Sequence, residues 1–181
     1  FEIRRLHETF AITTLYVTHD QAEAMVISDR VAVLQDGRVA QVGTAEELFE
    51  RPQTRFVAEF IGKTNLIDGR AEGAATVARG SLRLRVASAS LTPGAPVAVS
   101  IRPHQIELSP RAAAGATATP ETNVLTGTVV RASYLGDGVD YQIQVEGSDV
   151  VLRVAGPAPQ RVRLGESVSV SVAVSACVPL P

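Results

Sequence analysis

The sequence predicts an α/β segment over residues 1–62, followed by an all-β barrel over residues 63–181. Up to Gly62, apolar residues recur at helical spacing on either side of short apolar runs, which is typical of mixed α/β structure. After Gly62 the helical spacing stops. Short alternating runs separated by Gly, Pro or Asp take over, and this pattern favours a small barrel. We therefore expect two domains of different class.

The composition excludes several classes of protein. The 181 residues carry a net charge of −2, which indicates no binding surface for nucleic acid. Cys177 is the only cysteine, so an intramolecular disulfide is excluded and a reducing cytoplasm is favoured. No apolar run reaches the length needed to span a bilayer, and the first residues do not resemble a signal peptide. We expect a soluble chain.

The first elements place one histidine between a strand and a helix. Apolar spacing predicts a helix over 2–10, and the β-branched apolar run from Thr14 to Val17 predicts a buried strand. Asp20, followed three residues later by Glu23, has the form of a helix start and predicts a helix over 21–27. His19 then lies where the strand ends, which is the edge of an open α/β sheet where ligands bind.

The rest of the first segment reads as a hairpin and two helices. Asp36-Gly37 is typical of a hairpin turn, and Thr44 with Glu47 has the spacing of a capping box. Gly62 is placed to end the last helix. In order, we expect strand Val31–Leu34, a return strand Arg38–Val42, a helix after Thr44 and a helix from Thr54 to Ile61. This order is typical of the end of an α/β domain.

The second segment predicts nine short strands and one long loop. The loop is the low-complexity stretch Ser109 to Glu121. The expected strands are Asn65–Ala71, Ala75–Arg79, Leu82–Val86, Val97–Arg102, Gln105–Leu108, Gly127–Tyr134, Val139–Val145, Val150–Val154 and Val168–Val174.

The region around His19 resembles a known family. The blocks 18–25 (THDQAEAM), 28–34 (SDRVAVL), 36–39 (DGRV) and 41–43 (QVG) are similar, in order, to the last segment of an ABC-transporter ATPase. In that family the histidine contacts the γ-phosphate of ATP, and the resemblance assigns this role to His19. An imidazole suits the role, because it can hydrogen-bond a phosphate oxygen.

The second segment resembles the TOBE-type, OB-like regulatory domain of importers for maltose, polyamines, ferric iron and sulfate. The similarity is carried by 99–106 (VSIRPHQI) and 127–137 (GTVVRASYLGD). His104 departs from the family, which usually has an acidic residue after Arg-Pro. The joining segment Phe60 to Leu66 is most similar to the polyamine-type members.

The resemblance implies the C-terminal part of the ATP-hydrolysing subunit of an ABC importer, most simply one for spermidine or putrescine. The expected partners are a second copy of the chain and the transmembrane permease subunits, and the expected location is the cytoplasmic face of the cell membrane. ATP and Mg²⁺ are expected in the full-length protein.

The chain alone is expected to be inactive. It has no G-x-x-x-x-G-K-[ST] phosphate-binding loop, and Gly62-Lys63-Thr64 follows a predicted helix without the earlier glycine. We expect that loop, the signature motif and the catalytic glutamate upstream of Phe1, so no nucleotide should bind to this chain alone. His7, His19 and His104 are too far apart in sequence to indicate a metal site.

Two alternatives stay open at this point. The barrel could instead be a stand-alone module that binds a small oxyanion, with Arg102, Arg131 and Arg153 near strand ends as the basic residues. The alternation of Leu82, Leu84 and Val86 with Arg83 and Arg85 leaves an apolar face, which either fills the barrel or mediates pairing of two copies.

Overall fold

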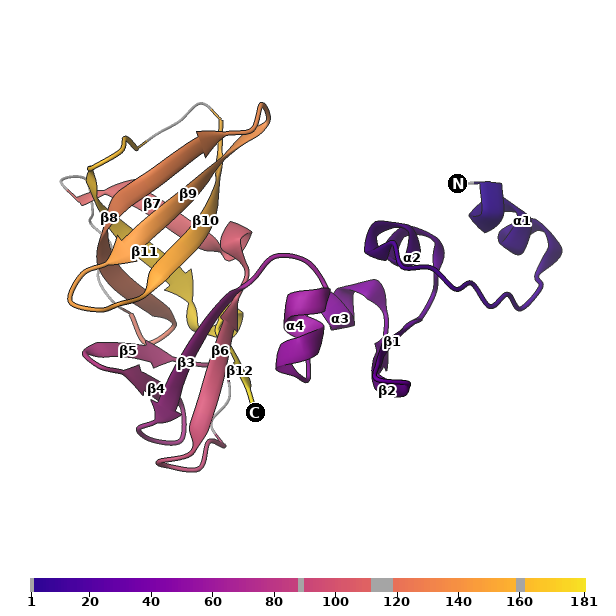
Figure 1. Ribbon diagram of the computed structural model, residues 1–181, viewed down its shortest axis with the longest axis horizontal. Helices are drawn as coiled ribbons and strands as arrows, with labels where there is room; N and C mark the ends of the chain where they lie inside the picture. Colours follow the sequence, from indigo (N-terminus) through magenta and orange to yellow (C-terminus); the bar gives the residue numbers. More distant parts are fainter. Residues whose placement is uncertain (1, 88–89, 112–118, 159–161) are drawn as a thin grey trace. The chain divides into compact units, whose positions relative to one another are not determined.

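The structure, a computed structural model, describes residues 2–87, 90–111, 119–158 and 162–181. The chain forms two compact units, Phe1–Gly62 and Lys63–Pro181 (Figure 1). We refer to them as the N-terminal unit and the β unit. None of the described helices combines the length and the apolar character that crossing a bilayer requires.

The helices and the hairpin of the N-terminal unit form as predicted. Thr44 accepts from the backbone N–H of Glu47, whose carboxylate accepts from the Thr44 N–H, so the capping box is confirmed. Asp36 and Gly37 have φ values of 50° and 74°, as a type I′ hairpin turn requires, and Gly62, with φ of 78°, follows the last helix. The elements are α1 (Glu2–Phe10), α2 (Gln21–Ile27), β1 (Val31–Gln35), β2 (Arg38–Gly43), α3 (Ala45–Glu50) and α4 (Arg55–Phe60).

The predicted strand from Thr14 to Val17 is wrong. These residues form no strand, and the side chains of Leu15 and Val17 are 92% and 87% exposed. A strand needs a neighbour for its backbone groups, but within the described residues of this unit β1 and β2 pair only with each other. The expected edge of an open α/β sheet is therefore not formed here, and an α/β class is not established for this unit.

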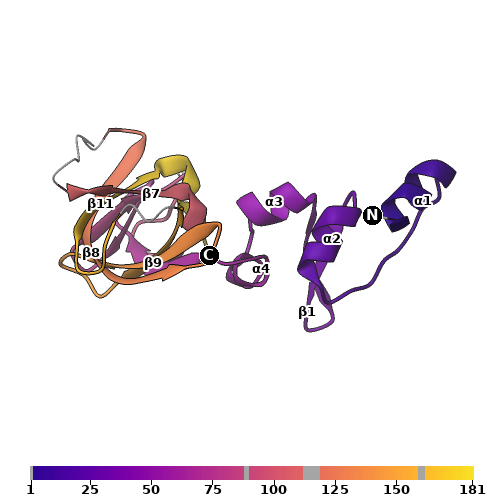
Figure 2. The ribbon, with the colours of Figure 1, turned by 90° about the horizontal axis from the view of Figure 1, so that it is seen from above.

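The β unit confirms the prediction of an all-β second segment. Two sheets of five antiparallel strands curl around a common interior (Figure 2). Their strands are β3 (Asn65–Ala71), β4 (Thr76–Arg79), β5 (Leu82–Arg85), β6 (Pro96–Ile101), β7 (Ile106–Pro110), β8 (Thr122–Tyr134), β9 (Gly138–Val145), β10 (Val151–Pro157), β11 (Ser167–Ala173) and β12 (Val178–Leu180).

The sequence patterns missed three features of these strands. β12 was not expected, and β8 begins at Thr122 rather than at Gly127. β7 continues to Pro110, so the predicted loop cannot begin at Ser109. Residues 112–118 of that loop lie outside the described residues.

The two sheets repeat one topology. Their orders are β12-β6-β3-β4-β5 and β7-β11-β8-β9-β10, which coincide when β3 to β6 are matched with β8 to β11. After β6, the 3-10 turn Pro103–Gln105 leads into β7, which joins the second sheet; after β11, the turn Val174–Ala176 leads into β12, which joins the first. The two halves of the β unit thus exchange their last strands. The matched strands begin alike, with NLIDG from Asn65 and NVLTG from Asn123.

Two buried asparagines connect an edge strand of each sheet to the other sheet. Asn65, in β3, accepts from the N–H of Arg153 in β10 at 2.7 Å and donates to the same residue's carbonyl at 2.8 Å. Asn123, in β8, does the same to Arg85 in β5, at 2.9 and 2.8 Å. Each side-chain amide therefore supplies the pairing that an edge strand otherwise lacks.

The interior of the β unit is mainly aliphatic. The side chains of Leu82, Leu84 and Val86 are all buried in it, together with Val99 and Tyr141. The apolar face of this strand therefore fills the barrel, and of the two interpretations left open by its alternation, the core interpretation is confirmed.

Candidate functional site

His19 lies in an exposed turn directly before α2. Asp20 caps that helix as predicted, because its carboxylate accepts from the N–H of Glu23 at 3.1 Å. This bond satisfies one of the N–H groups that the first turn of a helix leaves unpaired. The cap fixes where the helix begins, and hence where the preceding histidine stands.

Side-chain hydrogen bonds connect the residues before His19 to those after it. The carboxylate oxygen Oε2 of Glu23 accepts from the Tyr16 hydroxyl at 3.0 Å and from the Thr18 hydroxyl at 3.1 Å. The Thr18 hydroxyl oxygen in turn accepts from the N–H of Asp20 at 2.9 Å. Glu23 therefore does not return to the Asp20 N–H, as it would in a capping box, but ties the extended segment before His19 to the helix after it.

The Glu23 carboxylate also affects the ionisation of the Tyr16 phenol. The hydrogen bond to Glu23, and then the charge of that carboxylate, raise the pKa of Tyr16 above its usual value, so the phenol stays a donor. Within the described part of the chain, no side chain hydrogen-bonds the exposed His19 ring. The turn thus presents an imidazole that can donate to an oxyanion.

The other histidines do not join His19. His7 belongs to α1 and His104 to the turn before β7 in the β unit. Among the described residues, no group of three or more His, Cys, Asp and Glu side chains could hold a metal ion. Gly62-Lys63-Thr64 leads from α4 into β3, whereas a phosphate-binding loop leads from a strand into a helix, and Thr64 is engaged with the Ser100 hydroxyl at 2.8 Å.

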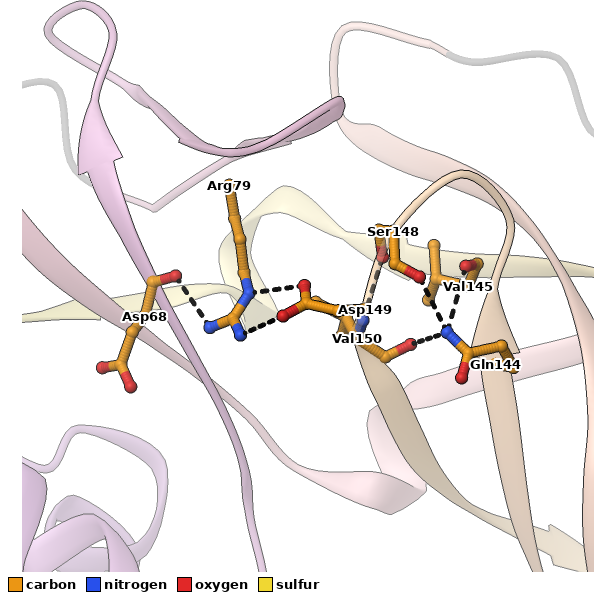
Figure 3. Close-up of polar contacts among 7 residues, drawn as sticks. All are labelled: Asp68, Arg79, Gln144, Val145, Ser148, Asp149 and Val150. Atoms are coloured by element: carbon orange, nitrogen blue, oxygen red, sulfur yellow. Dashed lines mark hydrogen bonds and ion pairs between the residues drawn. The ribbon is translucent and has the colours of Figure 1, made fainter.

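The β unit has an open hollow of about 860 Å³ beside the turn between β9 and β10. At its rim, the Arg79 guanidinium donates to both carboxylate oxygens of Asp149, at 3.0 and 2.7 Å (Figure 3). Arg79 lowers the pKa of Asp149, chiefly through this hydrogen bond. Arg111, also at the rim, lies 3.4 Å from Glu146. The charges of these two pairs cancel, so they do not select an anion.

The basic residues expected for oxyanion binding make contacts within the β unit. The Arg153 guanidinium donates through Nε and one Nη to both carboxylate oxygens of Asp140, and the Arg131 guanidinium donates to Ser133 at 3.3 Å. Arg102 is 3% exposed and donates to the Lys63 carbonyl at 3.3 Å. Arg131 and Arg153 both pair in register with Gln142 of β9, so they lie on the same face of that sheet, whereas Arg102 is buried after β6 and does not join them.

Sequence reasoning found His19 and Asp20 but missed the bonds that Tyr16 and Thr18 make to Glu23. The available signal was the spacing of polar groups: a tyrosine three residues before the histidine and a glutamate four residues after it. The prediction of a buried strand over 14–17 conceals this signal, because it includes Tyr16 in that strand.

Sequence comparisons relate this chain to import ATP-binding proteins. Residues 99–180 match the sequence family of the TOBE domain. The chain is 40% identical over 152 residues to a spermidine/putrescine import ATP-binding protein, PotA, of Nostoc sp., covering 80% of this chain and 39% of that protein. A second PotA, of Pseudomonas aeruginosa, is 36% identical over 180 residues, covering 95% of this chain and 46% of that protein.

A further relative is named for a different cargo, ferric iron. The Fe(3+) ions import ATP-binding protein FbpC of Brucella abortus is 36% identical over 149 residues, covering 80% of this chain and 39% of that protein. The chain thus spans less than half the length of the curated relatives it matches.

A solved structure shares the fold of the larger unit. The molybdate-bound cytoplasmic protein ModG superposes with a TM-score of 0.55 over 65% of this chain and 96% of its own, at 16% identity. At that identity the likeness shows the fold alone.

Proposed function

Since the chain is homologous to the C-terminal part of ABC importer ATP-binding subunits and carries a TOBE domain, we propose that the full-length protein hydrolyses ATP to drive import through permease subunits. The N-terminal unit is the end of its ATPase domain, and the β unit is its regulatory and pairing domain. The protein works on the cytoplasmic face of the membrane as a homodimer. The observation that carries this proposal is the similarity itself, which runs through both units in the Pseudomonas relative.

In this proposal His19 donates a hydrogen bond to a γ-phosphate oxygen of ATP. Charge on the phosphoryl oxygens shifts in the transition state, so a donor aimed at them lowers the barrier more than it strengthens binding. The capped turn before α2 supports the role, since it holds His19 at a fixed place while leaving the ring uncovered. In this proposal, the phosphate-binding loop, the signature motif and the residues that bind Mg²⁺ are supplied by a part of the full-length protein outside this chain.

The proposed cargo is a polyamine, spermidine or putrescine. Both polyamine and ferric iron relatives match the chain, and the polyamine assignment is supported by the joining segment 60–66 and by the 40% identity to the Nostoc protein. The test is uptake into vesicles that contain the full-length protein with its own permease and binding protein. ATP-dependent uptake of labelled spermidine, without uptake of ferric iron, supports the proposal. Uptake of iron alone overturns the polyamine assignment, and uptake of neither overturns both.

Pairing of two copies through the β unit is part of the same proposal. Its apolar interior is already filled, so the contact must be made by surface groups and strand edges that remain open. Sedimentation velocity of the 181-residue chain at micromolar concentration tests it. A dimer supports pairing through this part of the protein, and a strictly monomeric species rejects it.

A further inference from the structure

Within the described part of this chain, the side-chain hydrogen bonds from Tyr16 and Thr18 before His19 go to the Glu23 carboxylate. Ile12, Leu15 and Val17 are all exposed, so this stretch is not held by burial. Its polar side chains instead reach forward along the chain. Tyr16 and Thr18 both donate to one oxygen of Glu23, at 3.0 and 3.1 Å.

These bonds span His19 along the chain. The donors precede His19 by three residues and by one residue, and the acceptor follows it by four, on the first turn of α2. Asp20 adds two more bonds to this set. Its N–H donates back to the Thr18 hydroxyl, and its carboxylate caps the helix by accepting from the N–H of Glu23. Removing the Glu23 carboxylate breaks both hydrogen bonds at once, whereas removing the Tyr16 hydroxyl breaks only one of them.

We propose that Glu23 is a positioning residue for His19 and that it acts together with Tyr16. This inference rests on the proposed function, in which His19 meets a phosphate oxygen. A carboxylate suits the task because it accepts two donors through one oxygen without competing for the imidazole's partner. Glu23 itself does not touch the nucleotide.

The expected effect lies in turnover rather than in nucleotide binding. A hydrogen-bond donor aimed at developing charge contributes about 10²–10³ in rate, and a displaced donor loses part of that factor. In the full-length protein, Glu23→Ala should lower kcat by about 10-fold and leave the KM for ATP within about threefold. Tyr16→Phe should give a smaller loss, and Glu23→Gln should recover part of it, because the amide oxygen still accepts.

The decisive measurement is a double-mutant comparison. If Glu23 acts through His19, Glu23→Ala has no further effect on kcat in the His19→Ala background. A merely structural role lowers kcat by the same factor in both backgrounds. Glu46→Ala is the matched control, since Glu46 is an exposed glutamate in the first turn of another short helix, and its kcat should stay within about twofold of the parent.

The outcomes separate this inference from the function on which it rests. If His19→Ala keeps full activity, the role of His19 is wrong. If His19→Ala loses activity but Glu23→Ala does not, or if the Glu23 effect persists without His19, only the positioning role is overturned. Where Glu23→Ala fails to fold, Tyr16→Phe carries the same comparison in both backgrounds, and full activity of Tyr16→Phe overturns the proposal.

Discussion

Replacing Asn65 by Ala removes the side chain that closes one edge of the β unit. Three hydrogen bonds are lost: the two to the backbone of Arg153 at 2.7 and 2.8 Å, and one to the Ile101 carbonyl at 3.1 Å. Because Asn65 is only 7% exposed, water has little room to take over these bonds. The backbone N–H and C=O of Arg153 are left without their partner.

The structure sets the size of the effect. A polar group left unsatisfied in a buried position costs about 1–3 kcal/mol, and two such groups that are partly buried give an expected loss of about 2–4 kcal/mol in the free energy of unfolding. Asn123→Ala should cause a loss of the same order, since Asn123 is 5% exposed and makes the equivalent pair of bonds to Arg85.

Urea unfolding of the 181-residue chain, followed by far-ultraviolet circular dichroism, measures this difference. Thr128→Val is the control, because Thr128 is exposed on β8 and valine keeps its β-branched shape. It should change the unfolding free energy by less than about 0.5 kcal/mol. If Asn65→Ala is no more destabilising than this control, the two asparagines do not close the barrel.

Three further predictions concern the β unit and the isolated chain. Gly127→Ala should destabilise the chain by about 1–3 kcal/mol in the same unfolding assay, because an added Cβ would lie 2.6 Å from Ile143 and 2.7 Å from the Gln144 carbonyl. Gly73→Ala, with open space around it, should be nearly neutral. Burial raises the pKa of the Cys177 thiol to about 11, so the thiol ionises first in the unfolded chain. The unfolding free energy should therefore fall as pH rises from about 9 to 11. A Cys177→Ala variant should lack that part of the fall, and equal slopes of unfolding free energy against pH would contradict the assignment. Isothermal titration of the 181-residue chain with ATP·Mg should detect no binding tighter than about 1 mM, or roughly −4 kcal/mol, and tighter binding would show that the chain carries its own nucleotide site.

Local signals in the sequence predicted the structure where neighbouring residues decide it. Asp20 and Thr44 start helices through their own side chains, and Asp36-Gly37 turns a hairpin through its backbone preference. These features depend on residues no more than three positions apart. They are therefore visible without knowing the fold.

The features that were missed depend on distant parts of the chain. The run from Thr14 to Val17 has the composition of a strand, but none of the described strands pairs with it. The exchange of β7 and β12 between the sheets leaves no local mark, although the repeat beginning at Asn65 and Asn123 is readable once the two stretches are aligned. For the site, the sequence singled out His19, whereas the bonds from Tyr16 and Thr18 to Glu23 required coordinates.

The turnover number of the full-length His19→Ala protein tests the central proposal most directly. It should be measured at saturating ATP·Mg, together with the dissociation constant of ATP. We expect kcat to fall by about 10²–10³ while the dissociation constant stays within about threefold, because the donor acts mainly on charge that develops in the transition state. A turnover number within about threefold of the parent would contradict the role of His19 at the γ-phosphate.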